Sequence, residues 1–314
     1  MQVARLVPLL GVTLLVASSG PAFPGGDEPG LPVSSLARWQ NGRWQTWWRS
    51  DRAPQVWSED QHVLTAGVAW AATAPAIEMA QLRLSGRRGA WRTRLVVVRL
   101  DPARLRLSLE TGYGADGQPA WQADRVGTDV LFAVNAGQFV RTSPWGWLVL
   151  DGVERLPPGS GPLSTALTVD REGQVGWVAG DSIAARRGRG EVRFAFQSYP
   201  TLLRGGRVPE PLQRAGRGVD LAHRDARAAI GADSDGRLLV AMTRFDGLGD
   251  QLGFVPLGLT TPEMAAVMGA LGAREAVALD GGISAQMLVR DAEQALVWSG
   301  LRRVPLALVA RGRS

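Results

Sequence analysis

The sequence of 314 residues contains no cysteine, no lysine and only two histidines, His62 and His223. Without cysteine, the chain can form no disulfide, no thiolate metal site and no cysteine nucleophile. Two histidines also argue against a metal site built from several imidazoles. One aspartate with backbone carbonyls would be enough to hold Ca²⁺, but no dense acidic cluster marks such a site. We therefore expect no resident cofactor, and leave only Ca²⁺ open.

Because lysine is absent, every basic side chain is an arginine, and the formal net charge is +6. Arginine forks suit phosphate and carboxylate groups. The arginines are dispersed apart from the loop-like run 186–189, and the codon usage of a GC-rich genome accounts for most of them. Nucleic-acid recognition needs a sharper basic patch or motif. We expect no nucleic-acid partner.

Long apolar runs are also scarce, and the run at residues 6–16 is too short to span a bilayer comfortably. It follows Arg5 and precedes small residues up to position 22, which together make the three parts of a secretory signal. We predict a signal peptide at 1–22 and an exported mature protein, periplasmic or extracellular, without a transmembrane helix. The alternative is an uncleaved N-terminal anchor.

Glycine, with 39 residues, and proline, with 19, are abundant, and 45% of the chain is hydrophobic. This is the composition of a globular protein with many turns, as in a β-rich fold. Residues 23–35 are expected to form a flexible leader. We assign 23–61 to this leader and a tryptophan-rich N-terminal segment, and 62–314 to one main domain.

The tryptophan-rich segment holds Trp39, Trp44, Trp47, Trp48 and Trp57. Trp44, Trp47 and Trp48 have the i, i+3, i+4 spacing that predicts one face of a short helix. Such residues usually cover the edge of a core, although exposed tryptophans can also stack on sugar rings.

Short apolar or alternating runs bounded by turn residues predict a series of strands. They lie at 63–70, 93–100, 104–110, 130–134, 147–150, 193–197, 228–231, 237–242, 276–279, 295–298 and 304–309. Turn residues at 101–103 and at 232–236 predict that the two strands flanking each turn pair as a β-hairpin. A helix is predicted at 262–271, with Thr261 as its N-cap and Gly272 just past its end. The fold class is therefore α+β: a mixed, β-rich sheet core with a few helices and a single main domain.

Two of the predicted strands end in the same way. The strand at 130–134 runs into Asn135 and then Gly137, and the strand at 276–279 runs into Asp280, Gly281 and Gly282. Glycines permit positive φ and close backbone approach, so such strand ends can converge on one site. Asp280 is then either a catalytic carboxylate beside an anion cradle or a residue that caps its own turn.

The order of these segments resembles the phosphodiester glycosidase domain. The resemblance is carried, over roughly residues 62–310, by Asn135-x-Gly137-x-Phe139, then Asp151-Gly152, Arg227-x-x-Ile230-Gly231, a capped helix, and Leu279-Asp280-Gly281-Gly282-x-Ser284. It implies a mixed α/β domain and hydrolysis of a sugar 1-phosphodiester. The motifs depart from the family's usual pattern, because Ala136, Gln138, Ile283 and Ala285 replace glycine, phenylalanine or hydroxyl residues.

The resemblance implies roles for particular residues. Asp280 would steady or attack the sugar C1 or activate water, and Arg227 would hold the phosphate. Asn135 completes the predicted catalytic set. Gly137, Gly281, Gly282 and Ser284 are predicted to bind substrate. Independently of the resemblance, the loop residue His223 is predicted to face the substrate as a general acid or base, with a surface or structural role as the alternative. Asp151 and Asp246 precede glycines in turns, and a structural role is favoured for both.

We therefore expect an exported hydrolase that cleaves glycosyl-phosphate linkages in a cell-envelope or exported polysaccharide. Its partner would be a glycan or sugar-phosphate substrate. The alternatives are a non-catalytic glycan- or envelope-binding protein with a degenerate active site, and a structural envelope protein with a vestigial pocket. A pocket filled by Ile283 and Gln138 would favour the last of these.

Overall fold

The structure is a computed structural model that describes residues 33–58, 63–66, 68–86, 92–161, 163–217, 219–247, 255, 257–291 and 293–313. The predicted signal peptide at 1–22 lies outside the described residues. None of the helices in the described ranges is long and apolar enough to cross a membrane.

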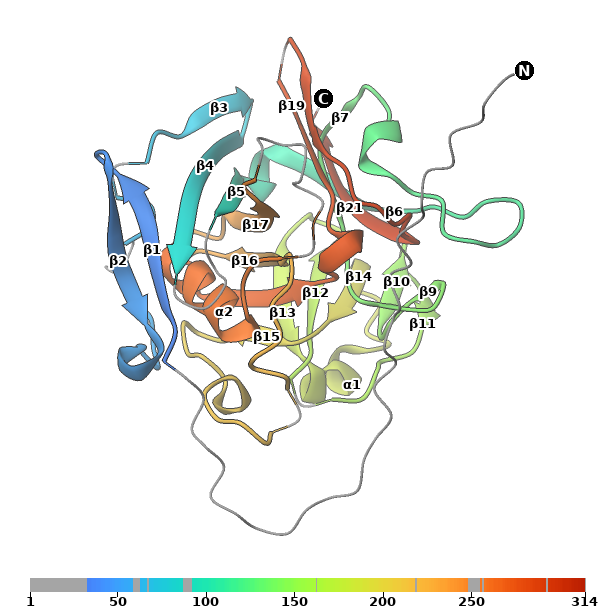
Figure 1. Ribbon diagram of the computed structural model, residues 1–314. Coiled ribbons are helices and arrows are strands. Elements are labelled where there is room, and N and C mark those ends of the chain that lie inside the picture. The colour runs from blue at the N-terminus through green and yellow to red at the C-terminus, as the bar shows by residue number, and fades with distance from the viewer. Residues whose placement is uncertain are drawn as a thin grey trace, which may run out of the picture. The chain divides into compact units, whose positions relative to one another are not determined.

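The largest sheet of the structure has nine strands, and Figure 1 shows how they are arranged. Its strands follow the order β15 (Thr201–Leu203), β18 (Glu275–Leu279), β16 (Ala228–Ala232), β17 (Leu238–Phe245), β5 (Thr93–Leu100), β4 (Ile77–Gly86), β1 (Ser35–Gln40) and β2 (Arg43–Arg49), with β3 (Ala71–Ala74) paired to β4. All of these pairs are antiparallel. We call it the large sheet.

Two smaller antiparallel sheets pack near it. The β7 sheet follows the order β20 (Ala295–Trp298), β19 (Met287–Arg290), β7 (Val130–Asn135), β21 (Leu306–Gly312) and β6 (Leu105–Thr111). The β14 sheet follows the order β11 (Val153–Leu156), β10 (Leu148–Leu150), β14 (Val192–Ser198), β12 (Thr165–Asp170) and β13 (Val175–Ala179). The short strands β8 (Phe139–Val140) and β9 (Ser143–Pro144) pair with each other, and the helices are α1 (Ile183–Arg186) and α2 (Thr261–Ala270).

The main core lies where one face of the large sheet meets the two smaller sheets. Ile230 from the large sheet, Phe132 from the β7 sheet and Phe196 from the β14 sheet belong to this one buried cluster. The other face of the large sheet packs against α2, where Ala229 and Val267 are buried together. Burying a side chain as large as Ile230, Phe132 or Val267 adds about 1.5–3 kcal/mol to the stability of the fold. This architecture confirms the predicted α+β, β-rich fold.

Helix α2 begins with a capping box, one residue earlier than the sequence predicts. The hydroxyl of Thr260 accepts a hydrogen bond from the backbone N–H of Glu263, and the carboxylate of Glu263 accepts one from the N–H of Thr260. The predicted N-cap, Thr261, is instead the first helical residue. The two adjacent threonines offer equivalent caps, and Glu263 decides between them because it stands three residues after Thr260.

The predicted hairpin of 93–100 with 104–110 is wrong, although both strands exist. β5 pairs with β4 and β17 in the large sheet, whereas β6 pairs with β21 in the β7 sheet. The 3₁₀ turn Pro102–Arg104 between them, capped by Asp101, carries the chain from one sheet to the other. The strand predicted at 63–70 is also wrong, because residues 63–66 form a turn.

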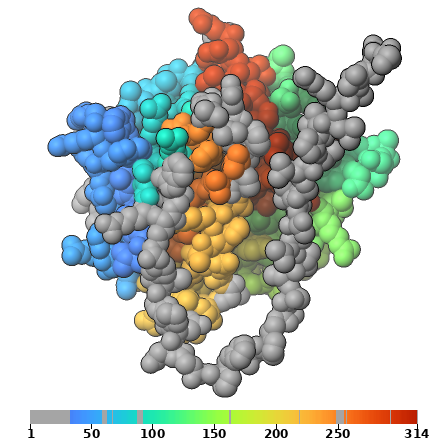
Figure 2. Space-filling view, in the orientation of Figure 1, coloured from blue at the N-terminus to red at the C-terminus, as the bar shows by residue number. Residues whose placement is uncertain are grey.

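The predicted helix around Trp44, Trp47 and Trp48 is a strand, β2. Asn41 and Gly42 form a tight turn with φ values of 51° and 77°, which is the geometry of a β1–β2 hairpin. This turn outweighs the helical spacing of the tryptophans. The hairpin joins the edge of the large sheet through β4, and Figure 2 shows it in blue at the surface.

Other predicted strands are confirmed, including the hairpin of β16 with β17 and the turn at Asp151-Gly152 between β10 and β11. The strand ends predicted to meet belong to β7 and β18. They come from different sheets.

Candidate active site

The ends of β7 and β18 meet, as the sequence predicts. Asn135, the last residue of β7, is fully buried, and its Nδ2 donates to the backbone carbonyl of Asp280 at 2.8 Å. Its Oδ1 accepts from the backbone N–H of Gln286 at 3.1 Å. The N–H of Asp280 in turn donates to the carbonyl of Gly137 at 2.9 Å. Asn135 thus fixes the backbone of the Asp280 turn.

The ends of β16 and β18 bring Arg227 to the same place. Leu279, the last residue of β18, pairs with Ala228, the first residue of β16. Because the strands are antiparallel, the residues just beyond this pair, Asp280 after β18 and Arg227 before β16, leave the sheet at the same end of the two strands. Gly281 packs so closely there that a Cβ would lie 2.3 Å from the carbonyl oxygen of the residue before Arg227. A larger residue would force the two segments apart.

Arg227 is half-buried and held by the backbone around it. Its Nε donates to the carbonyl of Leu259 at 2.9 Å and its Nη2 to the carbonyl of His223 at 2.6 Å. Burial lowers the pKa of Arg227, and the negative charges of Asp225 and Asp220 oppose that shift. The guanidinium stays charged at neutral pH, since arginine starts from so high a pKa. Among the described residues, its Nη1 has no hydrogen-bond partner, so one donor group remains for a ligand.

Asp225 lies close to the turn that carries Asp280 and stands two residues before Arg227. Its Oδ2 would be 2.8 Å from a Cβ at Gly282, and its charge acts on both Arg227 and Asp280. Burial raises the pKa of Asp225, against the backbone N–H of Ala226 and the charge of Arg227. Arg227 and Asp280 form no ion pair with each other in the part of the chain described. Asp225 is therefore the charge that links them.

Asp280 is a half-buried carboxylate whose surroundings shift its pKa in opposite directions. Burial raises its pKa, and the negative charge of Asp225 raises it further. The hydroxyl of Ser284 donates a hydrogen bond to it, and this bond and the positive charge of Arg302 lower the pKa. The net direction is upward. Two neighbouring carboxylates with raised pKa values are typical of acid–base sites.

A buried ion pair anchors the segment that carries Asp225. Arg224 donates Nη1 and Nη2 to the two carboxylate oxygens of Glu263 at 2.6 and 2.8 Å. Glu263 is fully buried in the first turn of α2. Asp225 and Leu259 also exchange backbone hydrogen bonds. Helix α2 therefore holds the 223–227 segment against the edge of the large sheet.

The predicted glycines shape the backbone. Gly137 and Gly282 have φ values of 76° and 56°, which favour glycine. The N–H of Gly282 donates to the carbonyl of Ala226 at 2.7 Å, so this donor serves the fold and not an anion. Ser284 is buried, with its hydroxyl on Asp280. These residues, like Asn135, surround and position the Asp280 turn.

His223 lies at the rim of the site. Its side chain is 60% exposed, and its Nε2 is 3.7 Å from Oδ2 of Asp225. Ile283 is 45% exposed, and Gln138 donates to the carbonyl of Tyr199 at 2.8 Å. Ile283 therefore points outward to solvent and fills no interior pocket, which argues against the vestigial-pocket alternative.

Asp225 and Arg302 were not predicted from the sequence as site residues. Asp225 stands two residues before Arg227, so the run from His223 to Arg227 contained the signal. Arg302 is remote in sequence, and its backbone N–H reaches the site by donating to the carbonyl of Ile283 at 3.0 Å. Within the described ranges, no three acidic or histidine side chains gather as metal ligands would.

Comparison with known proteins identifies the family. The sequence profile of the phosphodiester glycosidases matches residues 128–311, which include both strand ends and the segment between them. The chain belongs to the phosphodiester glycosidase family. The resemblance predicted from the sequence is confirmed, and the family points to phosphodiester glycosidase activity.

One solved structure of an enzyme shares the fold of this family member. The catalytic domain of zebrafish N-acetylglucosamine-1-phosphodiester alpha-N-acetylglucosaminidase, auto-inhibited by its pro-peptide, matches with a TM-score of 0.54 and 18% identity. The match covers 78% of this chain and 88% of that chain. A hypothetical protein from Synechocystis gives a TM-score of 0.49 and 16% identity, covering 78% of this chain and 64% of its own. Among curated protein sequences, no match is found.

Proposed function

We propose that the protein is an exported hydrolase that cleaves the bond between sugar C1 and a phosphodiester oxygen in a cell-envelope or exported polysaccharide. The observation that carries this proposal is the position of Asp225, which stands two residues before Arg227 and whose Oδ2 lies 2.8 Å from where a Cβ of Gly282 would be, next to the Asp280 turn. The paired ends of β16 and β18 thus bring together the cation of Arg227, which can bind a phosphate, and the carboxylates of Asp225 and Asp280, which can act at a sugar carbon. Family membership supports the same chemistry.

The cationic side of the site would hold the phosphate. One donor is the Nη1 of Arg227, which has no partner among the described residues. A second is the exposed Arg302, whose Nη2 also donates to the carbonyl of Arg141 at 2.7 Å. A phosphate placed there would have its charge balanced as the C1–O bond breaks, so the stabilisation grows toward the transition state. A phosphate leaving group departs as an anion and needs no proton from the enzyme.

The carboxylates would act on the sugar and on water. Asp280, held by Ser284, stabilises the positive charge that develops at C1. Asp225 accepts a proton from the attacking water, whose oxygen bonds to C1. His223 then receives that proton from Asp225 and passes it to solvent, because its imidazole is both close to Asp225 and exposed. The raised pKa of Asp225 makes it a stronger base near neutral pH.

The remaining predicted site residues would position these groups. Asn135 and Gly137 fix the backbone of Asp280 by hydrogen bonds, and Gly281 and Gly282 let it approach the segment that carries Asp225. Their side chains, where present, are committed to the protein. We therefore give them no direct contact with substrate.

Hydrolysis in H₂¹⁸O tests this proposal. We would supply UDP-N-acetylglucosamine and methyl phosphodiesters of several sugar 1-phosphates, and locate the label by mass spectrometry. The proposed reaction puts ¹⁸O on the released sugar and none on phosphate. Asp280→Asn and Asp225→Asn should each lower turnover by about 100-fold or more, whereas Asp235→Asn, at a turn aspartate that is 68% exposed, should not. Label on phosphate would show P–O cleavage and reject the mechanism.

Export rests on the predicted signal peptide at 1–22. We would express the full chain and a chain lacking these residues, fractionate the cells, and sequence the N-terminus of the mature protein. Cleavage near residue 22 and accumulation outside the cytoplasm, only for the full chain, would support export. Cytoplasmic retention of the full chain would reject it.

A second candidate function is non-catalytic glycan binding, and the tryptophan hairpin favours it. Trp39 and Trp44 are each 45% exposed, with ring centroids 5.3 Å apart in an edge-to-face pair. Exposed aromatic faces of this kind stack on sugars. Saturable polysaccharide binding without turnover, lost in Trp39→Ala and Trp44→Ala but kept in Asp280→Asn, would favour this function.

A further inference from the structure

A strongly basic groove lies at the far ends of the strands that carry the candidate site. Ala307 of β21 pairs with Asn135, whereas Arg311 of β21 pairs with Val130 at the start of β7. A strand rises about 3.3 Å per residue, so Arg311 lies about 17 Å from Asn135 along β7. The groove is therefore separate from the Asp280 turn.

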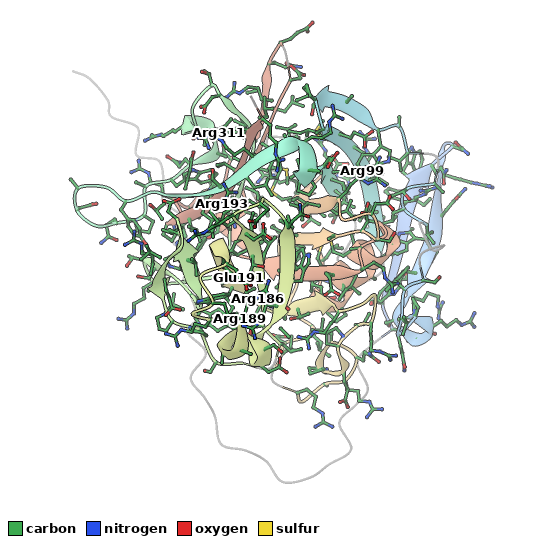
Figure 3. All side chains as sticks on the ribbon, turned by 180° about the vertical axis from the view of Figure 1, so that it is seen from behind. Arg99, Arg186, Arg189, Glu191, Arg193 and Arg311 are labelled. Atoms are coloured by element: carbon green, nitrogen blue, oxygen red, sulfur yellow. The ribbon has the colours of Figure 1, made fainter. Side chains whose placement is uncertain are left out.

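Five arginines from distant parts of the chain line this groove, whose volume is about 460 Å³: Arg106, Arg171, Arg193, Arg311 and Arg313. We call it the arginine groove. Arg106 belongs to β6, Arg193 to β14 and Arg311 to β21, while Arg171 lies in the turn between β12 and β13. Figure 3 shows Arg193 and Arg311 near each other on the face seen from behind. Its volume is within the range of small-molecule sites.

The carboxylates in the groove do not balance its charge. Asp129 and Glu172 are the acidic lining residues, so five arginines leave an excess of three positive charges. Arg311 is the most neutralised of them, because it pairs with Glu110 at 2.6 Å and with Asp129 at 2.5 Å. The remaining cations have no such double partner.

The other arginines keep donors available. Arg193 donates Nη2 to the carbonyl of Leu107 at 2.9 Å, and its enclosed Nε has no hydrogen-bond partner in the described part of the chain. Arg106 and Arg171 are exposed, and neither forms an ion pair with a described residue. Keeping several like charges together is unfavourable unless a counter-charge binds between them.

We propose that the arginine groove is a second binding site, which takes the phosphate groups of an anionic glycan chain. Guanidinium forks from several directions match phosphate oxygens in pairs. Residues of both the β7 sheet and the β14 sheet line the groove, so a bound anion would contact both sheets. Binding here does not depend on catalysis at Asp280, and it would hold a phosphate-bearing polymer to the protein between turnovers.

Asp129 lines the groove and would compete with a bound phosphate for the arginines. Its carboxylate bonds to Arg311, and the charge of Arg106 also acts on it. An incoming phosphate must share these cations with Asp129. Removing the carboxylate should therefore strengthen anion binding, whereas removing arginines should weaken it. The size of these two effects, compared with that of the same charge changes elsewhere on the surface, separates binding in the groove from attraction by net charge.

The test uses the full chain and inorganic polyphosphate as the probe, followed by calorimetry at low and moderate salt. The double variant Arg106→Gln/Arg171→Gln should weaken binding by about tenfold, and Asp129→Asn should strengthen it. A control, Arg43→Gln/Arg155→Gln, removes two exposed arginines elsewhere and should change binding little. Neutral dextran should not bind, and polygalacturonate should bind more weakly than polyphosphate.

Equal weakening by the groove and control variants would mean that net charge alone attracts the polymer, and would overturn the proposal. Equal affinity for polygalacturonate would overturn its phosphate preference. Asp280→Asn separates this proposal from the catalytic one, because it should abolish turnover and leave polyphosphate binding unchanged. The groove variants should in turn retain turnover of a small sugar phosphodiester.

Discussion

The side-chain amide of Asn135 donates to the backbone carbonyl of Asp280 at 2.8 Å, and so joins the last residue of β7 to the residue after β18. The same amide accepts from the N–H of Gln286 at 3.1 Å, on the other side of the turn. One side chain therefore sets the position of the candidate catalytic carboxylate between two sheets. Its importance to the site does not require contact with a substrate.

Replacing Asn135 should damage both stability and turnover. Asn135→Leu leaves a buried carbonyl and a buried N–H without partners, so we expect the free energy of unfolding to fall by about 2–4 kcal/mol. Urea denaturation measures this loss. Gln213→Ala, which removes an exposed side chain bonded to the carbonyl of Val208, should cost much less. A stable Asn135→Leu protein with normal turnover would contradict the assigned positioning role.

The raised pKa values of Asp225 and Asp280 predict how stability depends on pH. Burial raises both, so the folded protein keeps these protons at pH values where the unfolded chain has lost them. Stability is then lost as pH rises from the ordinary aspartate pKa through the raised one. Asp225→Asn and Asp280→Asn should both melt at higher temperature than the parent at neutral pH.

This advantage of the asparagine variants should shrink as pH falls and disappear below the ordinary aspartate pKa. Melting temperatures measured from about pH 3.5 to 8 test it. A difference that does not depend on pH would show that the substitutions act through packing and not through the charge.

The ion pair of Arg224 with Glu263 should contribute much more than a surface pair. Arg224→Ala leaves a fully buried carboxylate without its partner, and we expect a loss of about 3–5 kcal/mol. The matched control is Arg214→Ala, at a pair with Glu210 whose side chains are 71% and 58% exposed. It should cost less than about 1 kcal/mol. Similar losses in the two variants would contradict the anchoring role of Arg224.

Gly281→Ala should separate the two segments of the site. Its Cβ would lie 2.3 Å from a backbone oxygen, which cannot move without shifting the start of β16. We expect a loss of stability and of turnover together. Gly236→Ala is the control, because Gly236 has a φ of 79° and nothing within 4 Å of the added Cβ. That variant should lose about 1 kcal/mol and keep its turnover.

The sequence predicted well those strands whose identity depends on local pattern. β16 and β17 are apolar runs separated by an aspartate- and glycine-rich turn, and they pair as expected. The family was also found from spaced polar residues and glycines at strand ends. Such features survive because the backbone geometry there tolerates few alternatives.

Pairing across sheets was not available from local pattern. β5, an apolar run, and β6, an alternating run, follow one another in the sequence, yet the turn after Asp101 sends them into different sheets. Only the hydrophobic surface that each strand buries against distant partners decides this. The helix predicted from the tryptophan spacing around Trp44 was wrong for a related reason. The tight turn at Asn41 and Gly42 favours a hairpin, and this outweighs the helical spacing of the tryptophans.

The roles of site residues were harder still to obtain from sequence. Asn135 and Ser284 were placed correctly beside Asp280, but their side chains bond to the protein itself. Asp225 is the carboxylate whose charge acts on both Arg227 and Asp280. Its importance depends on the pairing of β16 with β18, which the sequence does not show. Arg302 is distant in sequence and approaches the Asp280 turn through a backbone hydrogen bond to Ile283, which no local motif predicts.

The pairing of Ala228 with Leu279 makes this edge unusually intolerant of changes in chain length. Side chains alternate between faces, so deleting a single residue inside β16 would exchange its inward and outward sets. Ile230 would turn toward α2, and the charged groups beyond the strand would be carried to the wrong side. Point substitutions can weaken the site by degrees, whereas one lost codon in this strand would abolish it.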